Sequence, residues 1–307
     1  MRGNPDSCGV WAPCLSFADG LFWLVYTDVK RFDGSFKDAH NYIVTAPSIE
    51  GPWSDPVYVN SAGFDPSLFH DDDGRKWFIQ MQWNHRPEAY NTNGFHKAFD
   101  GIRCQEWDAK TQSLIGPVHN IFGGTDLGLV EGAHLFKKNG WYYITAAEGG
   151  TGYDHAITMG RSRDLLGPYA IHPDKWLITS KDAPDAVLQR AGHGQYVETP
   201  EGEVYHTHLC GRPLPPHRRC TLGRETALQK CVWGEDGWLR LAQGGMVPDV
   251  LVPSPDGATT RPKPAQVTSD FDDGHLPVDF QWLRTPEPQR LFSLGDRRGH
   301  LRLFGRE

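Results

Sequence analysis

Four hairpins of one design recur along the chain, and this repeat constrains the fold more than any other feature of the sequence. Each hairpin joins two short apolar segments through a turn that ends in glycine, and its second segment contains aromatic residues. The turns are Asp19-Gly20, Asp73-Gly74, Asn139-Gly140 and Glu201-Gly202. The first three dipeptides are typical of tight hairpin turns, and Glu-Gly is a weaker signal. Recurrence at an interval of about 60 residues indicates a β-propeller in which each hairpin begins a blade.

The turn glycines also define a common register for the strands that precede them. Nine residues before the four glycines stand Trp11, Asp65, Glu131 and His193. The innermost strands of a propeller line its central channel, so residues in the same register converge near the axis. Each residue also has an ordinary alternative, such as a turn cap for Asp65 or an exposed strand edge for Glu131. Because all four positions carry residues with functional chemistry, a shared pocket is the favoured interpretation.

Composition and charge narrow the range of functions. The chain has 307 residues, 38% of them hydrophobic, and a net charge of −7 without a long basic run. Nucleic acid is therefore not expected as a partner. No apolar run approaches the length of a membrane span, so no membrane association is expected either. Residues 1–20 lack the pattern of a signal peptide, which predicts a cytoplasmic protein.

The six cysteines show neither the spacing of a zinc site nor that of a disulfide framework. Cys14 lies in an apolar strand and is predicted to be a buried thiol. Cys210 and Cys220 flank a proline-rich loop, and a disulfide between them is the alternative to free thiols. So few cysteines favour a reducing compartment.

Several linked motifs resemble glycoside hydrolase family 43, and most closely its β-xylosidases with a C-terminal β-sandwich. The motifs are GVWAP (9–13), GFDPSLFHDDDG (63–74), EGAHLFKKNGWYYITAAEGGTGYDHA (131–156), AGHGQYV (191–197) and LGRETALQK (222–230). The resemblance covers nearly the whole chain. It implies an all-β fold, a five-bladed β-propeller that here lacks its first blade, followed by the start of a β-sandwich domain. Blades two to five are expected in residues 1–250, a linker in 251–266 and the first sandwich strands in 267–307.

The resemblance implies inverting hydrolysis of terminal β-1,4-xylosyl units, with Glu131 as the general acid. Asp65 would orient that acid and raise its pKa, because a nearby carboxylate disfavours a second negative charge. The family's general base is an Asp in an NPDPS-like motif. NPDS at 4–7 is not assigned to this role, since Asp6 lies just before VWAP, in the segment entering the second blade. The chain is therefore expected to be a fragment or mis-started product that is inactive for lack of the base.

The other expected site residues would hold the sugar. The resemblance makes Arg224 a ligand of the sugar hydroxyls, although an ion pair with Glu225 is an alternative. His193 is either a hydrogen-bonding residue at the pocket floor or a metal ligand, or else a core histidine. Trp11 and Trp83 would stack on pyranose faces, or pack between blades. Thr151 resembles a residue that lines the subsite of the terminal sugar.

Two other functions remain open at this stage. One is an α-L-arabinofuranosidase or arabinanase on the same fold, and the other is an inactive fragment or a sugar-binding propeller. The expected partner is a xylooligosaccharide or arabinoside substrate, and the full-length enzyme could form a homo-oligomer. No cofactor is required, although the resemblance allows a structural calcium ion in the propeller channel.

Overall fold

The computed structural model describes residues 7–32, 38–84, 98–255, 267–277, 280–282 and 287–305. Within these ranges the chain is built from antiparallel strands, and the helical elements are limited to short 3₁₀ turns such as η2 (Pro288–Arg290). The all-β prediction is confirmed. Among the described residues, no helix is both long and apolar enough to cross a membrane.

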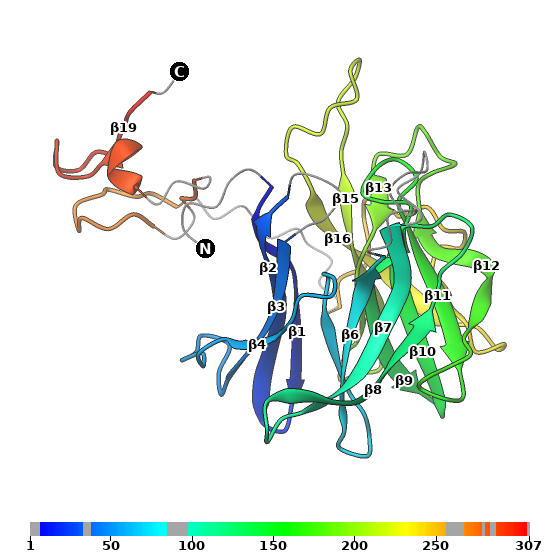
Figure 1. Ribbon diagram of the computed structural model, residues 1–307. Coiled ribbons are helices and arrows are strands. Elements are labelled where there is room, and N and C mark those ends of the chain that lie inside the picture. Colours follow the sequence, from blue (N-terminus) through cyan, green and yellow to red (C-terminus); the bar gives the residue numbers. More distant parts are fainter. Residues whose placement is uncertain are drawn as a thin grey trace.

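Four sheets follow one another along the chain and form the blades of a propeller (Figure 1). Blade A contains β1 (Gly9–Ala18), β2 (Leu21–Arg31), β3 (Asp38–Ala46) and β4 (Val57–Asn60). Blade B contains β5 (Ser67–His70), β6 (Lys76–Trp83), β7 (Phe99–Asp108) and β8 (Ser113–Phe122). Blade C contains β9 (Glu131–Lys138), β10 (Trp141–Glu148), β11 (Ala156–Ser162) and β12 (Ala170–Thr179). Blade D contains β13 (Gln189–Gly192), β14 (Tyr196–Glu198), β15 (Val204–Gly211), β16 (Glu225–Trp233) and β17 (Leu239–Leu241).

The described structure has four blades, so the prediction of a five-bladed propeller is wrong. The number five came from the family resemblance. A blade needs its own four-stranded meander, and the sequence supplies only four glycine hairpins to begin one. Each of these hairpins joins an inner strand to the next strand of its sheet, as β1–β2, β5–β6, β9–β10 and β14–β15 show, and in blade D the short strand β13 precedes the hairpin.

The C-terminal residues form a separate small element. β18 (Phe292–Ser293) pairs antiparallel with β19 (Arg302–Leu303), directly after η2. Figure 1 draws this ribbon in red, away from the four blades. It lies within residues 267–307, the segment that is predicted to begin a β-sandwich.

The core lies between the faces of neighbouring blades. Blades A and B pack Trp23, Val25 and Ile43 against Leu68, Phe78 and Trp107. Blades B and C share the largest cluster, in which Ile79, Met81 and Ala133 are fully buried. Blades C and D join through Ile157, Met159, Cys231, Leu239 and Leu241. Burial of such side chains contributes about 1.5–3 kcal/mol each, so blade packing holds the inner strands in place.

One buried amide connects blades A and B beside the GFD motif. Asn41 donates from Nδ2 to Gln80 Oε1 at 2.8 Å and lies 3.1 Å from the carbonyl of Gly63. It also accepts a hydrogen bond from Thr27 Oγ1 at 2.7 Å. Asn41, Gln80 and Thr27 have no exposed surface. The start of the GFD motif is therefore fixed by polar groups of the preceding blade.

Replacing this amide by an apolar side chain of similar size should destabilise the propeller. Asn41→Leu leaves buried groups of Thr27 and Gln80 without their partner, which should lower the free energy of unfolding by about 2–4 kcal/mol in urea titrations. Asn120→Leu is the control, because Asn120 is exposed and donates to the Asp100 carbonyl. It should cost about 1 kcal/mol or less. Equal losses in both variants would contradict the account of Asn41.

Candidate active site

All seven residues singled out from the sequence line one pocket. Its volume is about 670 Å³, and it contains Trp11, Asp65, Trp83, Glu131, Thr151, His193 and Arg224. Trp11 comes from blade A, Asp65 and Trp83 from blade B, Glu131 and Thr151 from blade C, and His193 and Arg224 from blade D. The register that the turn glycines define therefore brings side chains from four sheets together.

The backbone turns sharply where the inner strands reach this pocket. Residues with left-handed φ recur at or beside the predicted positions, namely Ala12 (34°), Asp65 (52°), Gly132 (55°) and His193 (39°). The strand pairing of β1 and β9 is also interrupted there, between Trp11 and Cys14 and opposite Glu131. Such irregularities redirect a side chain out of the regular alternation. They aim the site residues into the pocket rather than into the blade interfaces.

A short polar contact ties the two carboxylate-bearing strands together. Ser67, two residues after Asp65, donates from Oγ to the carbonyl of Ala133 at 2.5 Å. Ala133 lies two residues after Glu131. Gly132 also allows blade D to approach this strand, because a Cβ at this position would lie 2.5 Å from Nε2 of His193. The GFD and EG motifs are thus parts of one assembly.

Asp65 and Glu131 are both buried, with 7% and 8% of their surface exposed. Burial raises the pKa of Glu131 well above its usual range, and the negative charge of Asp65 raises it further, while Arg224 acts in the opposite direction. Burial also raises the pKa of Asp65, but the positive charges of His193, when protonated, and Arg224 oppose that shift. Of the two carboxyl groups, Glu131 is accordingly the one that keeps its proton to higher pH. A buried acid beside a second carboxyl is suited to proton donation.

His193 lies beside Asp65. Its Nδ1 lies 3.7 Å from Asp65 Oδ2, and its ring lies 6.2 Å from the ring of His134 in blade C. The side chain is 18% exposed, so it faces the pocket and is not enclosed in the core. It is therefore placed to orient the Asp65 carboxylate.

Binding of a metal ion is another role that the sequence leaves open for His193. The described residues include no group of three or more His, Cys, Asp or Glu side chains that could hold one. His193, Asp65 and Glu131 do not form such a set, so they do not fit a metal centre. A structural calcium ion in the channel stays a prediction.

Aromatic rings form one wall of the pocket. The Phe64 ring is the centre of this group, at 5.4 Å from Trp11, 5.2 Å from Trp83 and 5.9 Å from Phe99. Trp83 is 2% exposed and belongs to the core between blades B and C, so packing accounts for most of its surface. Trp11 is more accessible and donates from Nε1 to the Ser7 carbonyl at 2.8 Å.

Sequence reasoning did not single out Phe32, Phe64 or Phe99, which also line the pocket. Phe64 directly precedes Asp65, and this adjacency was the available signal. Phe32 and Phe99 come from other strands, at positions that no motif marks. Only the folded arrangement brings their rings to Trp11 and Trp83.

Arg224 and Thr151 enter from exposed loops at the pocket mouth, between β15 and β16 and after β10. The alternative role for Arg224, an ion pair with Glu225, is not what the structure shows. Glu225 pairs with Arg212 across the base of the hairpin, with Nη2 and Oε1 at 2.6 Å. The Arg224 charge instead acts on Asp65 and Glu131. Cys210 and Cys220, on the same hairpin, are free thiols, and Cys14 is buried as predicted.

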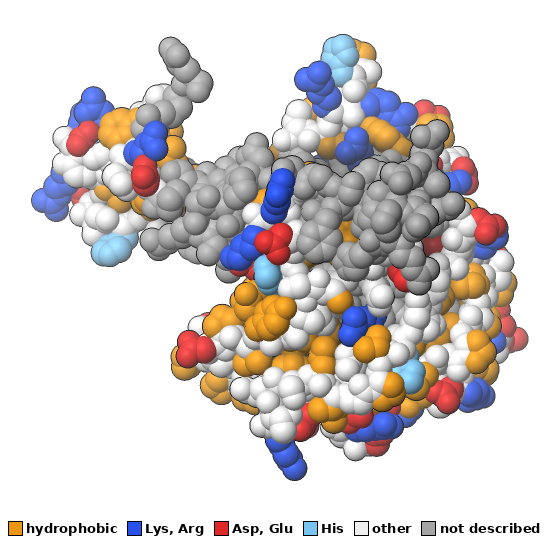
Figure 2. Space-filling view, viewed as in Figure 1, with side chains coloured by type: hydrophobic (Ala, Val, Ile, Leu, Met, Phe, Trp, Pro, Cys, Tyr) orange, Lys and Arg blue, Asp and Glu red, His pale blue; other side chains and the backbone are white. Residues whose placement is uncertain are grey.

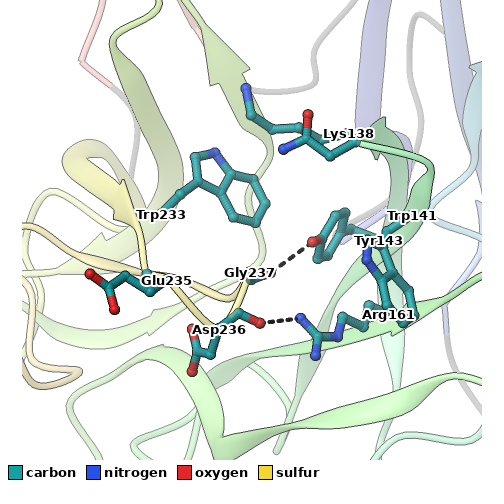
Figure 3. Close-up of a pocket in the computed structure, with 10 residues that line it drawn as sticks. Lys138, Trp141, Tyr143, Arg161, Trp233, Glu235, Asp236 and Gly237 are labelled. Atoms are coloured by element: carbon teal, nitrogen blue, oxygen red, sulfur yellow. Dashed lines mark hydrogen bonds between the residues drawn. The ribbon is translucent and has the colours of Figure 1, made fainter.

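A different pocket lies between blades C and D, and Figure 3 shows two hydrogen bonds between residues that line it. Tyr143 donates from its hydroxyl to the Gly237 carbonyl at 2.7 Å, and Arg161 donates to the Asp236 carbonyl at 2.7 Å. The Trp141 ring is covered by the guanidinium groups of Arg161 and Arg163, at 4.7 and 3.8 Å. These contacts join the two blades.

Comparison with known proteins agrees with the geometry. The sequence model of glycosyl hydrolases family 43 matches residues 1–239.

The chain belongs to glycosyl hydrolases family 43.

The model of the beta xylosidase C-terminal concanavalin A-like domain matches residues 268–307 of this family 43 chain. A xylosidase/arabinosidase 43B from Humicola insolens is 58% identical over the whole chain, and a beta-xylosidase from Bacillus subtilis is 46% identical. The chain covers 55% and 58% of these two relatives.

Among solved structures, a xylan beta-1,4-xylosidase from Bacillus halodurans is 54% identical, with a TM-score of 0.89. That match covers 100% of this chain and 57% of the relative. The family 43 chain thus spans little more than half the length of the relatives it matches.

The contact between Gly132 and His193 gives a test of the site geometry. Gly132→Ala forces a Cβ into the imidazole ring and places alanine at φ 55°. Gly74→Ala is the control, because Gly74 has φ 85° with nothing within 4 Å of an added Cβ. Both variants should lose about 1–2 kcal/mol of stability from the backbone alone. Only Gly132→Ala should lose more and shift the imidazole NMR signals of His193. Unchanged His193 signals in Gly132→Ala would show that the ring does not pack there.

Proposed function

We propose that this pocket removes terminal β-1,4-linked xylosyl units from xylooligosaccharides, with inversion at the anomeric carbon. The observation that carries the proposal is the buried Glu131, whose pKa is raised by burial and by Asp65. Glycosidases need such a protonated carboxyl at the leaving oxygen. The names of the Humicola insolens, Bacillus subtilis and Bacillus halodurans relatives support a xyloside as substrate.

In this proposal Glu131 donates its proton to the glycosidic oxygen as the bond to the anomeric carbon breaks. The departing sugar leaves as a neutral alcohol, and water adds to the opposite face of the xylosyl ring. Asp65 keeps the Glu131 proton in place until then, because two adjacent buried carboxylates cannot both ionise at low cost. Arg224 would hold sugar hydroxyls through its several N–H donors. Trp11 would stack on the sugar, and Thr151 would line the subsite of the terminal sugar.

The described pocket carries two carboxyl groups, Asp65 and Glu131, and no third among the lining residues that the structure describes. Inverting hydrolysis also needs a base to take a proton from the attacking water. We therefore expect slow turnover by this chain. Asp6, in the NPDS segment, lies outside the described residues.

An α-L-arabinofuranosidase activity is the second candidate. The name of the Humicola insolens relative joins xylosidase with arabinosidase, and it is the relative at 58% identity. Both sugars are pentoses, and the same acid could serve either leaving group.

The test is to assay the purified chain on 4-nitrophenyl β-xyloside with and without sodium azide. We expect a rate about 10²–10⁴-fold below that of a relative with a complete set of carboxylates. Azide should accelerate the reaction, because this nucleophile needs no base, and the product should be the α-xylosyl azide. The matched arabinofuranoside is assayed in parallel.

Glu131→Gln is the control for the role of the acid. It should abolish azide-dependent cleavage of xylobiose but retain part of the cleavage of the aryl xyloside, whose good leaving group needs little protonation. Equal losses on both substrates would contradict the acid assignment. A rate without azide that matches the relative would place a base within these 307 residues, with Asp6 as the leading candidate. Cleavage of the arabinofuranoside alone would overturn the xylosidase proposal.

A further inference from the structure

A second pocket adjoins the candidate active site and is lined by positive charge. Its volume is about 630 Å³, and Tyr153, Arg190, His217, Arg218, Arg219 and Arg224 are among its lining residues. No Asp or Glu belongs to the described lining. Figure 2 shows basic side chains gathered on the hairpin that protrudes at the top of the view, where β15 leads to β16, and the sequence of this segment makes them Arg and His. The positive charge of this pocket contrasts with the net charge of the whole chain, which is −7.

Within the described part of the chain, Arg190, Arg218 and Arg219 have no carboxylate partner, whereas the charge of Arg224 acts on the buried Asp65 and Glu131. Arg218 contacts the neutral Gln189, with Nη2 and Oε1 at 3.5 Å. Arg212, at the base of the same hairpin, shows the contrast, because Glu225 accepts three hydrogen bonds from it. Unpaired guanidinium groups that share one pocket repel each other, and an anion bound there would relieve that repulsion.

Two of these arginines are held in fixed positions on a tyrosine ring. The guanidinium carbons of Arg190 and Arg218 lie 4.7 and 4.4 Å from the centre of the Tyr153 ring. The Tyr153 hydroxyl donates to the Arg218 carbonyl at 3.1 Å. The Nε of Arg190 is buried without a hydrogen-bond partner among the described groups. Groups ordered before binding lose less conformational entropy when a ligand arrives, which favours recognition.

The basic pocket and the carboxylate pocket share structural parts. Arg224 lines both of them. The loop after β10 also contributes to both pockets, since Thr151 lines the carboxylate pocket and Tyr153 lines the basic pocket. One ligand can therefore occupy the sugar pocket and extend into the basic pocket.

We propose that the basic pocket binds the carboxylate of a uronic acid residue carried by the saccharide. This inference rests on the proposed function, because it assumes that a saccharide occupies the adjoining pocket. A neutral xylosyl chain offers no charge for four arginines to pair with. A sugar carboxylate is planar and can accept two parallel hydrogen bonds from one guanidinium group. The pocket therefore extends the substrate class to acidic oligosaccharides.

The test compares two ligands with the full 307-residue chain by isothermal titration calorimetry at neutral pH and low salt. One ligand is xylotriose, and the other is xylotriose with a single glucuronic acid branch. The acidic ligand should bind at least about fivefold more tightly, and added salt should reduce the preference. Arg219→Gln should remove most of the preference and leave xylotriose binding unchanged. Arg75→Gln is the matched control, because Arg75 is an exposed arginine in the blade B turn, paired with Asp73.

Each outcome decides between the claims. Equal binding of both ligands would overturn the uronic acid site and leave the proposed function standing. A preference that Arg219→Gln and Arg75→Gln reduce equally would show general electrostatics and not this pocket. Inorganic phosphate can be added at the same concentration as the acidic ligand. If phosphate then abolishes the tighter binding of that ligand, the pocket binds any small anion, and the proposal is overturned. Binding of neither ligand would contradict both the uronic acid site and the proposed function.

Discussion

Burial of Asp65 and Glu131 in one pocket is the constraint on which the other features of the site depend. A buried carboxylate without a partner is costly, so the pair is stable only if one member stays protonated. The raised pKa of Glu131 means that its favourable contribution to folding is present at low pH and is lost as pH rises through the folded pKa. The packed faces of the four blades offset this cost. The propeller core thus keeps Glu131 protonated to a higher pH than an exposed glutamic acid would be.

The sequence predicts which residues line the candidate pocket better than it predicts the number of blades. The offset from the turn glycines finds Trp11, Asp65, Glu131 and His193, because strand register repeats from blade to blade. Blade number is predicted correctly by the hairpins and wrongly by the resemblance to a five-bladed family. The pairing of Glu225 with Arg212 could not be foreseen, since it depends on how a long hairpin closes. The tilted contact between the rings of Phe64 and Trp83 could not be foreseen either, because Phe64 precedes β5 whereas Trp83 ends β6.

Charge is divided between the two adjoining pockets. The carboxyl groups lie at the starts of the innermost strands of blades B and C, whereas Arg218, Arg219 and Arg224 lie on the loop between β15 and β16 and Arg190 lies in β13. Arg224 belongs to both sets, and its charge restrains the pKa of Asp65 and of Glu131. A positive charge that acted more strongly on Glu131 would lower the pKa of this carboxyl and favour loss of its proton. The exposed position of Arg224 limits this effect, because solvent screens its charge. An anion in the basic pocket would reduce it further, which couples ligand charge to the protonation of the acid.

The most direct test of this account is the pH titration of Glu131 in the folded chain, followed by NMR of the ¹³C-labelled side-chain carboxyl. An unperturbed glutamic acid titrates at about 4.3. The account predicts that Glu131 titrates well above that value, and that Asp65→Asn lowers its pKa by removing the neighbouring negative charge. A Glu131 carboxyl that titrates at or below the ordinary value would contradict the account. So would a pKa that Asp65→Asn leaves unchanged.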